Sequence, residues 1–190
     1  AVPVALTTCE RYGTEIYVER LRRMGAERVF LAIGSYRTDE KRRRDTLDAL
    51  RRYIPIFRQA GFEVGVWLWA FMVKGDRRYT HITSPGGAVS ADQVCPSDDA
   101  FVRFAADYVA GIAACGPDLI LYDDDFRCGF LDCGLGCACE NHRAYMSGLL
   151  GKEVAADGLN ERVFSGGQNE YRSAFLQANG HFLKRFAQAM

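Results

Sequence analysis

Three consecutive aspartates, Asp123, Asp124 and Asp125, follow a short apolar run and are the residues best suited to acid–base chemistry. Adjacent carboxylates repel one another, which raises the pKa of at least one of them unless a cation compensates. A raised carboxyl suits a general acid, and glycosidic cleavage uses two carboxyl groups. Clustered carboxylates also suit hard cations, and a purely structural role at a strand end is the third alternative. Side chains alternate along an extended chain, so Asp123 and Asp125 should share one direction and Asp124 the other.

Two tryptophans, Trp67 and Trp69, alternate with Leu68, so both indoles should face the same side of a strand. If that side is open, they offer flat apolar surfaces to a sugar ring and N–H donors to its hydroxyls. A pair of core tryptophans is the alternative. The other predicted substrate-binding residues are Tyr36, His81 and Arg127.

The chain has seven cysteines, and four of them fall between Cys128 and Cys139. An odd number rules out a framework in which every cysteine is in a disulfide within the chain. Clustering of this kind indicates a local metal site or a local disulfide. Thiolates are soft ligands, which favours zinc over calcium or magnesium.

Short apolar runs alternate with amphipathic stretches along the chain, which predicts a parallel sheet covered by helices. The predicted strands are residues 2–6, 28–33, 62–69 and 118–122. The predicted helices run over about 14–24, 39–60, 97–112, 141–150 and 169–189, with Ser97 as a helix cap and Pro55 as a kink or a new start. Residues 70–96 are predicted as a long excursion and residues 151–168 as irregular.

The predicted fold class is α/β, of the (β/α) TIM-barrel type. The 190 residues supply about four β/α units, whereas a full barrel needs about 250 residues. We therefore predict one partial barrel domain over residues 1–190, the N-terminal half of a longer barrel, with a Cys- and Gly-rich insertion at about 127–142. A four-stranded layered α/β domain is the alternative. The exposed half-barrel face predicts self-association.

Composition argues against some partners. Lys plus Arg and Asp plus Glu number 24 each, so the formal net charge is zero. This balance gives no electrostatic case for nucleic acid or an anionic membrane surface. No apolar stretch approaches the roughly 20 residues that span a bilayer. A soluble protein is expected, and both a cytoplasmic location and secretion with a removed signal stay open.

Two cysteine motifs, Cys95-Pro-Ser-Asp-Asp-Ala-Phe101 and Cys137-Ala-Cys-Glu-Asn-His142, resemble those of family 42 β-galactosidases. These barrel enzymes carry a Cys-Pro turn after strand three and a Cys-x-Cys-x-x-Cys run after strand four. The resemblance implies a structural zinc ion held by Cys95, Cys137, Cys139 and His142, with histidine in the place of the last cysteine, an acceptable zinc ligand. Three alternatives stay open: Cys133 as a substitute ligand, a disulfide between Cys128 and Cys133, or cysteines that are free and buried or in disulfides without a metal ion.

The strand-four end carries the other part of the resemblance. In family 42 this strand ends in Asn-Glu, and the glutamate is the acid/base. Matching the strand ends places Asp124 at the Asn and Asp125 at the Glu, one methylene shorter, which changes the position of the acid. The family's partner carboxylate lies on strand seven, which is not among these residues.

The predicted function is therefore that of a glycoside hydrolase-like domain acting on carbohydrate, incomplete and inactive as these 190 residues alone. One alternative is a non-catalytic carbohydrate-binding or scaffold barrel. Another is a metal-dependent hydrolase using Asp123, Asp124 and Asp125.

Overall fold

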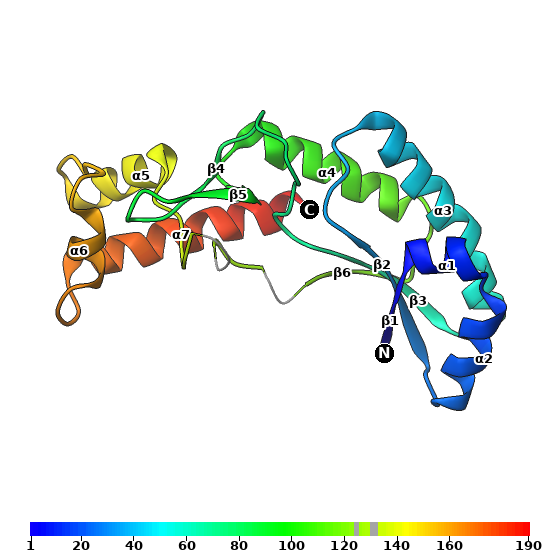
Figure 1. Cartoon of the computed structure of the whole chain (residues 1–190). Helices are drawn as coiled ribbons and strands as arrows, with labels where there is room; N and C mark the ends of the chain where they lie inside the picture. The colour runs from blue at the N-terminus through cyan, green and yellow to red at the C-terminus, as the bar shows by residue number, and fades with distance from the viewer. Residues whose placement is uncertain (124–125, 130–132) are drawn as a thin grey trace. The chain divides into compact units, whose positions relative to one another are not determined.

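A computed structural model describes residues 1–123, 126–129 and 133–190 of the chain (Figure 1). These residues form two compact units. Unit 1 comprises Ala1–Ala70 and Asp107–Asp125, and unit 2 comprises Phe71–Ala106 and Phe126–Met190. The predicted catalytic residues Asp124 and Asp125 lie outside the described residues.

Unit 1 contains a four-stranded parallel sheet with the strand order β1-β2-β3-β6. The strands are β1 (Val2–Ala5), β2 (Arg28–Gly34), β3 (Glu63–Leu68) and β6 (Leu119–Tyr122). The four strands predicted from the sequence, and their parallel arrangement, are thus confirmed. Within the described residues the sheet ends at β1 and β6 and does not close, so the half-barrel, its single domain and its self-association stay predictions.

Three helices belong wholly to unit 1: α1 (Leu6–Tyr12), α2 (Glu15–Arg23) and α3 (Glu40–Gln59). Asp39 caps α3 by accepting a hydrogen bond from the backbone N–H of Arg42 at 2.8 Å. Pro55 lies inside this helix, so α3 neither ends nor restarts there. The sequence did not predict α1, because its threonines have low helix propensity and β1 leads into it directly.

Alternating strand residues form the apolar core of unit 1. Val29 and Leu31 of β2 pair with Val64 and Val66 of β3, and all four are fully buried. On the opposite face of β3, a Cβ atom at Gly65 would lie 2.5 Å from the Phe30 ring. Only glycine therefore allows Phe30 to cover β3 at that point.

Unit 2 combines one antiparallel hairpin with helices. The hairpin joins β4 (His81–Thr83) to β5 (Val89–Val94), and the helices are α5 (Glu140–Leu150), α6 (Leu159–Phe164) and α7 (Glu170–Ala189). Helix α4 (Asp99–Ala113) begins in unit 2 and ends in unit 1. The sequence did not predict the hairpin, and the irregular assignment of residues 151–168 was wrong because they contain α6. Both β4 and α6 are too short to show a clear period.

The start of α4 corrects one predicted cap. Asp98, not Ser97, accepts a hydrogen bond from the Phe101 N–H, at 2.9 Å. The second carboxylate oxygen of Asp98 accepts a hydrogen bond from the Thr80 N–H at 2.7 Å. Ser97 is thereby left to contact Cys95.

Apolar side chains of the helices form the core of unit 2 at one end. The cluster consists of Ala138, Met146, Val154, Leu159, Val163, Ala174, Phe175 and Ala178. None of the helices in the described ranges is both long enough and apolar enough to cross a membrane.

Candidate functional site

Four buried side chains of unit 2 bring their donor atoms together: Cys95, Cys137, Cys139 and His142. Their sulfur and nitrogen atoms all lie within 4.8 Å of one another. Cys95 directly follows β5, Cys137 and Cys139 precede α5, and His142 lies in the first turn of that helix. The fold thus joins the two cysteine motifs that the sequence analysis placed at one metal site.

The distances within this group distinguish a metal site from a disulfide. The Cys95 sulfur lies 3.5 Å from that of Cys137 and 3.7 Å from that of Cys139. The Nδ1 atom of His142 lies 3.6 Å from the Cys95 sulfur and 3.3 Å from the Cys139 sulfur. A disulfide bond is about 2.05 Å long, so these sulfurs are not bonded to one another. Three sulfurs and one imidazole nitrogen at this spacing can hold a metal ion.

The two remaining cysteines of the loop are neighbours of this group. Cys128 and Cys133 are buried in the same cluster as the ligand cysteines. All seven cysteines lie in the described residues and are free thiols, so the alternative of a Cys128–Cys133 disulfide is not present. Cys133 also does not belong to the four-residue group, which His142 completes instead.

Burial and mutual hydrogen bonding set the acidity of the three thiols. Burial raises the pKa of Cys95 well above its ordinary value and that of Cys137 to about 12. Hydrogen bonds from Cys137 and Cys95 lower the pKa of Cys139, with a further contribution from His142. Burial thus opposes ionisation of Cys95 and Cys137, and a positive charge among the three sulfurs would lower the pKa of each thiol.

A buried amide on α7 fixes the backbone at Cys137. The Oδ1 atom of Asn179 accepts a hydrogen bond from the Cys137 N–H at 2.7 Å, and its Nδ2 donates to the Cys137 carbonyl at 3.1 Å. At the preceding Gly136, where φ is +83°, a Cβ atom would lie 2.2 Å from the Phe175 ring. The loop can therefore approach α7 only with glycine at this position.

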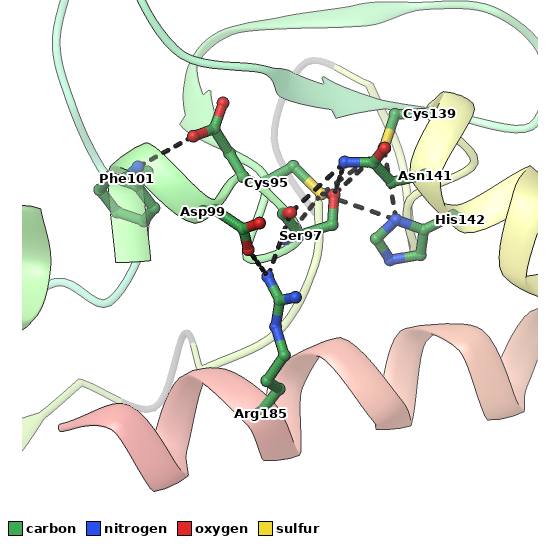
Figure 2. A network of polar contacts seen from close by, with 9 residues as sticks. Cys95, Ser97, Asp99, Phe101, Cys139, Asn141, His142 and Arg185 are labelled. Carbon is green, nitrogen blue, oxygen red and sulfur yellow. Dashed lines mark hydrogen bonds and ion pairs between the residues drawn. The ribbon is translucent and has the colours of Figure 1, made fainter. Parts of the chain in front are cut away.

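A polar network surrounds the Cys95 sulfur (Figure 2). The Ser97 hydroxyl lies 3.0 Å from this sulfur, and the Ser97 N–H donates to it at 3.4 Å. Asn141 of α5 donates to the Ser97 hydroxyl at 3.2 Å, and Arg185 of α7 donates to the Ser97 carbonyl at 3.2 Å and to Asp99 at 2.7 Å. The network thus joins α5 and α7 to the segment that carries Cys95.

The imidazole of His142 is held by packing. Its ring centroid lies 4.5 Å from that of Phe182 on α7. The ring presents Nδ1 to the sulfurs, and among the described residues its buried Nε2 has no hydrogen-bond partner. With the proton on Nε2, Nδ1 keeps its lone pair for a metal ion.

The predicted carbohydrate residues of unit 1 lie at the carboxyl edge of its sheet. The Asp123 N–H donates to the Leu68 carbonyl at 3.0 Å, one step past the pair Leu68–Tyr122. This bond continues the parallel register and sets Asp123 beside Trp69. Residues in register point to the same face, so Asp123, Trp69 and Trp67 share one face of the sheet.

This face is partly open. Leu121, which pairs with Trp67, is 41% exposed, and both tryptophans are half-buried, whereas Asp123 is buried. The Trp67 Nε1 is buried and has no hydrogen-bond partner in the described part of the chain. A buried indole N–H without a partner costs free energy.

The architecture of the chain has a counterpart among solved structures. This is the catalytic domain of β-amylase from Paenibacillus polymyxa, with a TM-score of 0.57 and 10% sequence identity. The alignment covers 99% of this chain and 61% of that one, so the chain spans less than two thirds of its length. At this identity the likeness shows the fold alone. No family model and no curated protein matches the sequence, and the family 42 resemblance rests on the sequence motifs.

The other predicted substrate-binding residues occupy different surroundings. Tyr36 is 3% exposed, and its hydroxyl lies 2.9 Å from that of Tyr122, whose side chain points to the opposite face from Asp123. In unit 2, Arg127 is exposed, and His81 is buried with its ring nitrogens 2.8 Å from the Ser90 carbonyl and 2.7 Å from that of Asp76.

Those two carbonyl contacts explain the burial of His81 without a ligand. Sequence reasoning did not identify Ser97 or Asn179 as parts of the metal group's surroundings. The nearest signal was the polar Asn179-Gly180 pair, which is unfavourable within a helix.

Proposed function

We propose that this chain is part of a glycoside hydrolase-like protein that acts on carbohydrate at the carboxyl edge of the unit 1 sheet. The observation that carries the proposal is the register that sets Asp123 beside Trp69. A carboxylate next to an accessible indole combines acid–base chemistry with a platform for a sugar ring. The fold likeness to the β-amylase catalytic domain supports a distant glycoside hydrolase-like kind.

In this proposal Asp125 is the general acid/base. It protonates the glycosidic oxygen as the bond between that oxygen and the anomeric carbon breaks, and a second carboxyl group either bonds to that carbon itself or activates the water that does. Asp123 or Asp124 is the acidic neighbour that tunes Asp125, and the indoles of Trp67 and Trp69 hold the sugar. We place the second carboxylate in a further part of the protein, since the chain spans 61% of the β-amylase domain.

The test is the substitution Asp125→Asn in the full-length protein, assayed for reducing-sugar release on a panel of polysaccharides and aryl glycosides. Loss of the acid/base should lower kcat by roughly 10²–10⁴-fold with unchanged thermal unfolding. Asp107→Asn is the matched control, because Asp107 is an exposed carboxylate on α4. Full activity of the Asp125→Asn protein would remove the assignment.

A second candidate is a carbohydrate-binding barrel without catalysis. It is favoured by Asp125 itself, since an aspartate stands where the resembled family has a longer glutamate. Calorimetry separates the two functions: saturable glycan binding that Trp69→Ala weakens, without turnover of any panel substrate, supports the binding protein.

We further propose that the Cys3His group holds a structural zinc ion. A tetrahedron with Zn–S bonds of about 2.3 Å and a Zn–N bond of about 2.0 Å has S···S edges of about 3.8 Å and S···N edges of about 3.5 Å. The four distances of 3.3–3.7 Å within the group are close to these edges. Four protein ligands leave no open position, so the ion would supply folding energy and no direct chemistry.

Metal analysis of the purified protein tests this assignment. About one zinc ion per chain is expected, falling to near zero in Cys139→Ser. The matched control is Cys115→Ser, which removes a half-buried thiol that is not part of the group. A metal-free protein that takes up no zinc would contradict the proposal.

A further inference from the structure

A polar cavity lies in unit 1, at the carboxyl ends of β1 and β2. Its volume is about 200 Å³, and α1, β2 and α3 contribute to its wall. The polar residues of the wall are Thr7, Glu10, Arg37, Arg42, Asp45 and Thr46. In α/β sheets, ligands bind outside the carboxyl ends of the strands, and nothing in the chemistry proposed for Asp125 uses this cavity.

One guanidinium of the wall is fixed in place. The Arg37 Nη1 donates to the Ser35 hydroxyl at 2.9 Å, and its Nη2 donates to the Ile33 carbonyl at 3.3 Å. Ser35 is buried and Arg37 half-buried. A guanidinium has five N–H donors. The N–H groups of Arg37 that do not take part in these two hydrogen bonds can therefore bind a ligand at the end of β2. A fixed donor loses little conformational entropy when a ligand binds.

The charges of the wall do not neutralise one another. Within the described residues, no ion pair joins Arg37 or Arg42 to Glu10 or Asp45. Asp45 instead forms an ion pair with Lys41 at 3.2 Å. Among the described residues, the Arg42 guanidinium has no hydrogen-bond or ion-pair partner. The wall therefore carries two guanidiniums and one carboxylate, that of Glu10, for which the described residues show no ion pair. Unpaired donors and an acceptor in one wall suit an anionic ligand that also carries hydroxyls.

We propose that this cavity binds a single carboxylate-bearing sugar unit, such as a hexuronate. Arg37 and Arg42 receive the carboxylate, because the planar guanidinium matches it in a bidentate pair. Glu10 accepts hydrogen bonds from the ring hydroxyls, and the Thr7 hydroxyl donates to them or accepts from them. Pockets for drug-sized ligands measure about 300–1,000 Å³, so this smaller cavity fits one ring. The proposal extends beyond the glycosidase site and does not depend on it.

The experiment is an NMR titration of the protein with D-glucuronate and, as a neutral match of the same ring size, D-glucose. Glucuronate should shift the amides of Thr7, Ile33 and Thr46 saturably and bind at least about tenfold more tightly than glucose. Arg42→Gln should weaken glucuronate binding about tenfold. Arg44→Gln is the matched control, because Arg44 is on the same helix, pairs with Glu40 and does not line the cavity.

Three results would overturn the proposal: no saturable shifts, equal affinity for glucose, or equal effects of Arg42→Gln and Arg44→Gln. The outcome is independent of the proposed glycosidase chemistry. Asp125→Asn should leave glucuronate binding at this cavity unchanged, whereas Arg42→Gln should leave glycoside turnover unchanged if the substrate is neutral.

Discussion

In unit 1 the centre of the sheet consists of apolar strand side chains such as Val64 and Val66, whereas the loop of unit 2 surrounds three thiols and an imidazole. Unit 1 joins four strands through parallel pairing. In its described residues, unit 2 has a two-stranded hairpin as its sheet and relies on polar groups to fix the segment before α5. A segment rich in glycine and cysteine has little apolar surface to bury, so it needs a metal ion or a buried hydrogen-bonding side chain to become ordered.

Each unit uses one polar side chain to hold backbone from a distant part of the sequence. In unit 1, Asp118 accepts hydrogen bonds from the Val64 N–H at 2.7 Å and from Arg58 at 2.8 Å. In unit 2, Asn179 makes two bonds to Cys137. The Asp118 side chain is 37% exposed and Asn179 only 8%. Water can replace the hydrogen bonds of Asp118 but not those of Asn179. Loss of the Asn179 side chain should therefore lower the free energy of unfolding more than loss of the Asp118 side chain.

Removal of the proposed zinc ion should have the largest effect on stability. It should destabilise unit 2 and leave unit 1 folded. Structural zinc contributes on the order of 10 kcal/mol in small zinc domains. We expect chelation at neutral pH to increase hydrogen exchange of amides around Cys95 and Cys137–His142, while amides of β2 and β3 stay protected. Hydrogen exchange with mass spectrometry measures both units in one sample.

The control for that experiment is restoration by added zinc. Equal loss of protection in β2 and β3 would contradict this difference between the units, because unit 1 would then depend on the ion as well.

The second largest effect is expected for Asn179→Ala. The substitution leaves the buried N–H and carbonyl of Cys137 without their partner, which costs about 1–3 kcal/mol for each unsatisfied group. Zinc affinity should fall with stability, because Cys137 loses its fixed position. Gln177→Ala, at an exposed position of the same helix, is the control. Denaturant unfolding and a competitive zinc titration are the measurements, and equal behaviour of the two variants would contradict the clamp.

The smallest effect concerns Asp118 and pH. The Val64 N–H, followed by Arg58, lowers the pKa of this exposed carboxyl below its ordinary value. Its stabilising contribution is thus present above the unfolded-state pKa of about 3.9 and is lost as pH falls through the folded value. Asp118→Asn should reduce stability slightly at pH 7 and flatten the acid limb of a stability–pH curve. An unchanged acid limb would show that the contact contributes nothing measurable.

The sequence predicted the parts of the fold that follow a clear period. The strand at 62–69 is an unbroken apolar run, and the helix from Asp39 has a capping aspartate and a regular apolar stripe. The hairpin β4–β5, α1 and α6 were not predicted, because their patterns are too short to separate from loop. For the Cys3His group, the resemblance to the family 42 motifs named all four residues that the structure brings together.

Local periodicity and composition were enough to predict the four parallel strands and the absence of net charge, because neither depends on contacts between distant segments. The four members of the Cys3His group followed from the motif resemblance. Only the tertiary structure decided which side chains from distant segments contact the Cys3His group and line the cavity. Ser97, Asn179 and Arg185 reach the metal group, and Arg37 and Arg42 meet in one cavity, through contacts between segments far apart in the chain. The face shared by Asp123 and Trp69 likewise depends on pairing register, which a single strand does not encode.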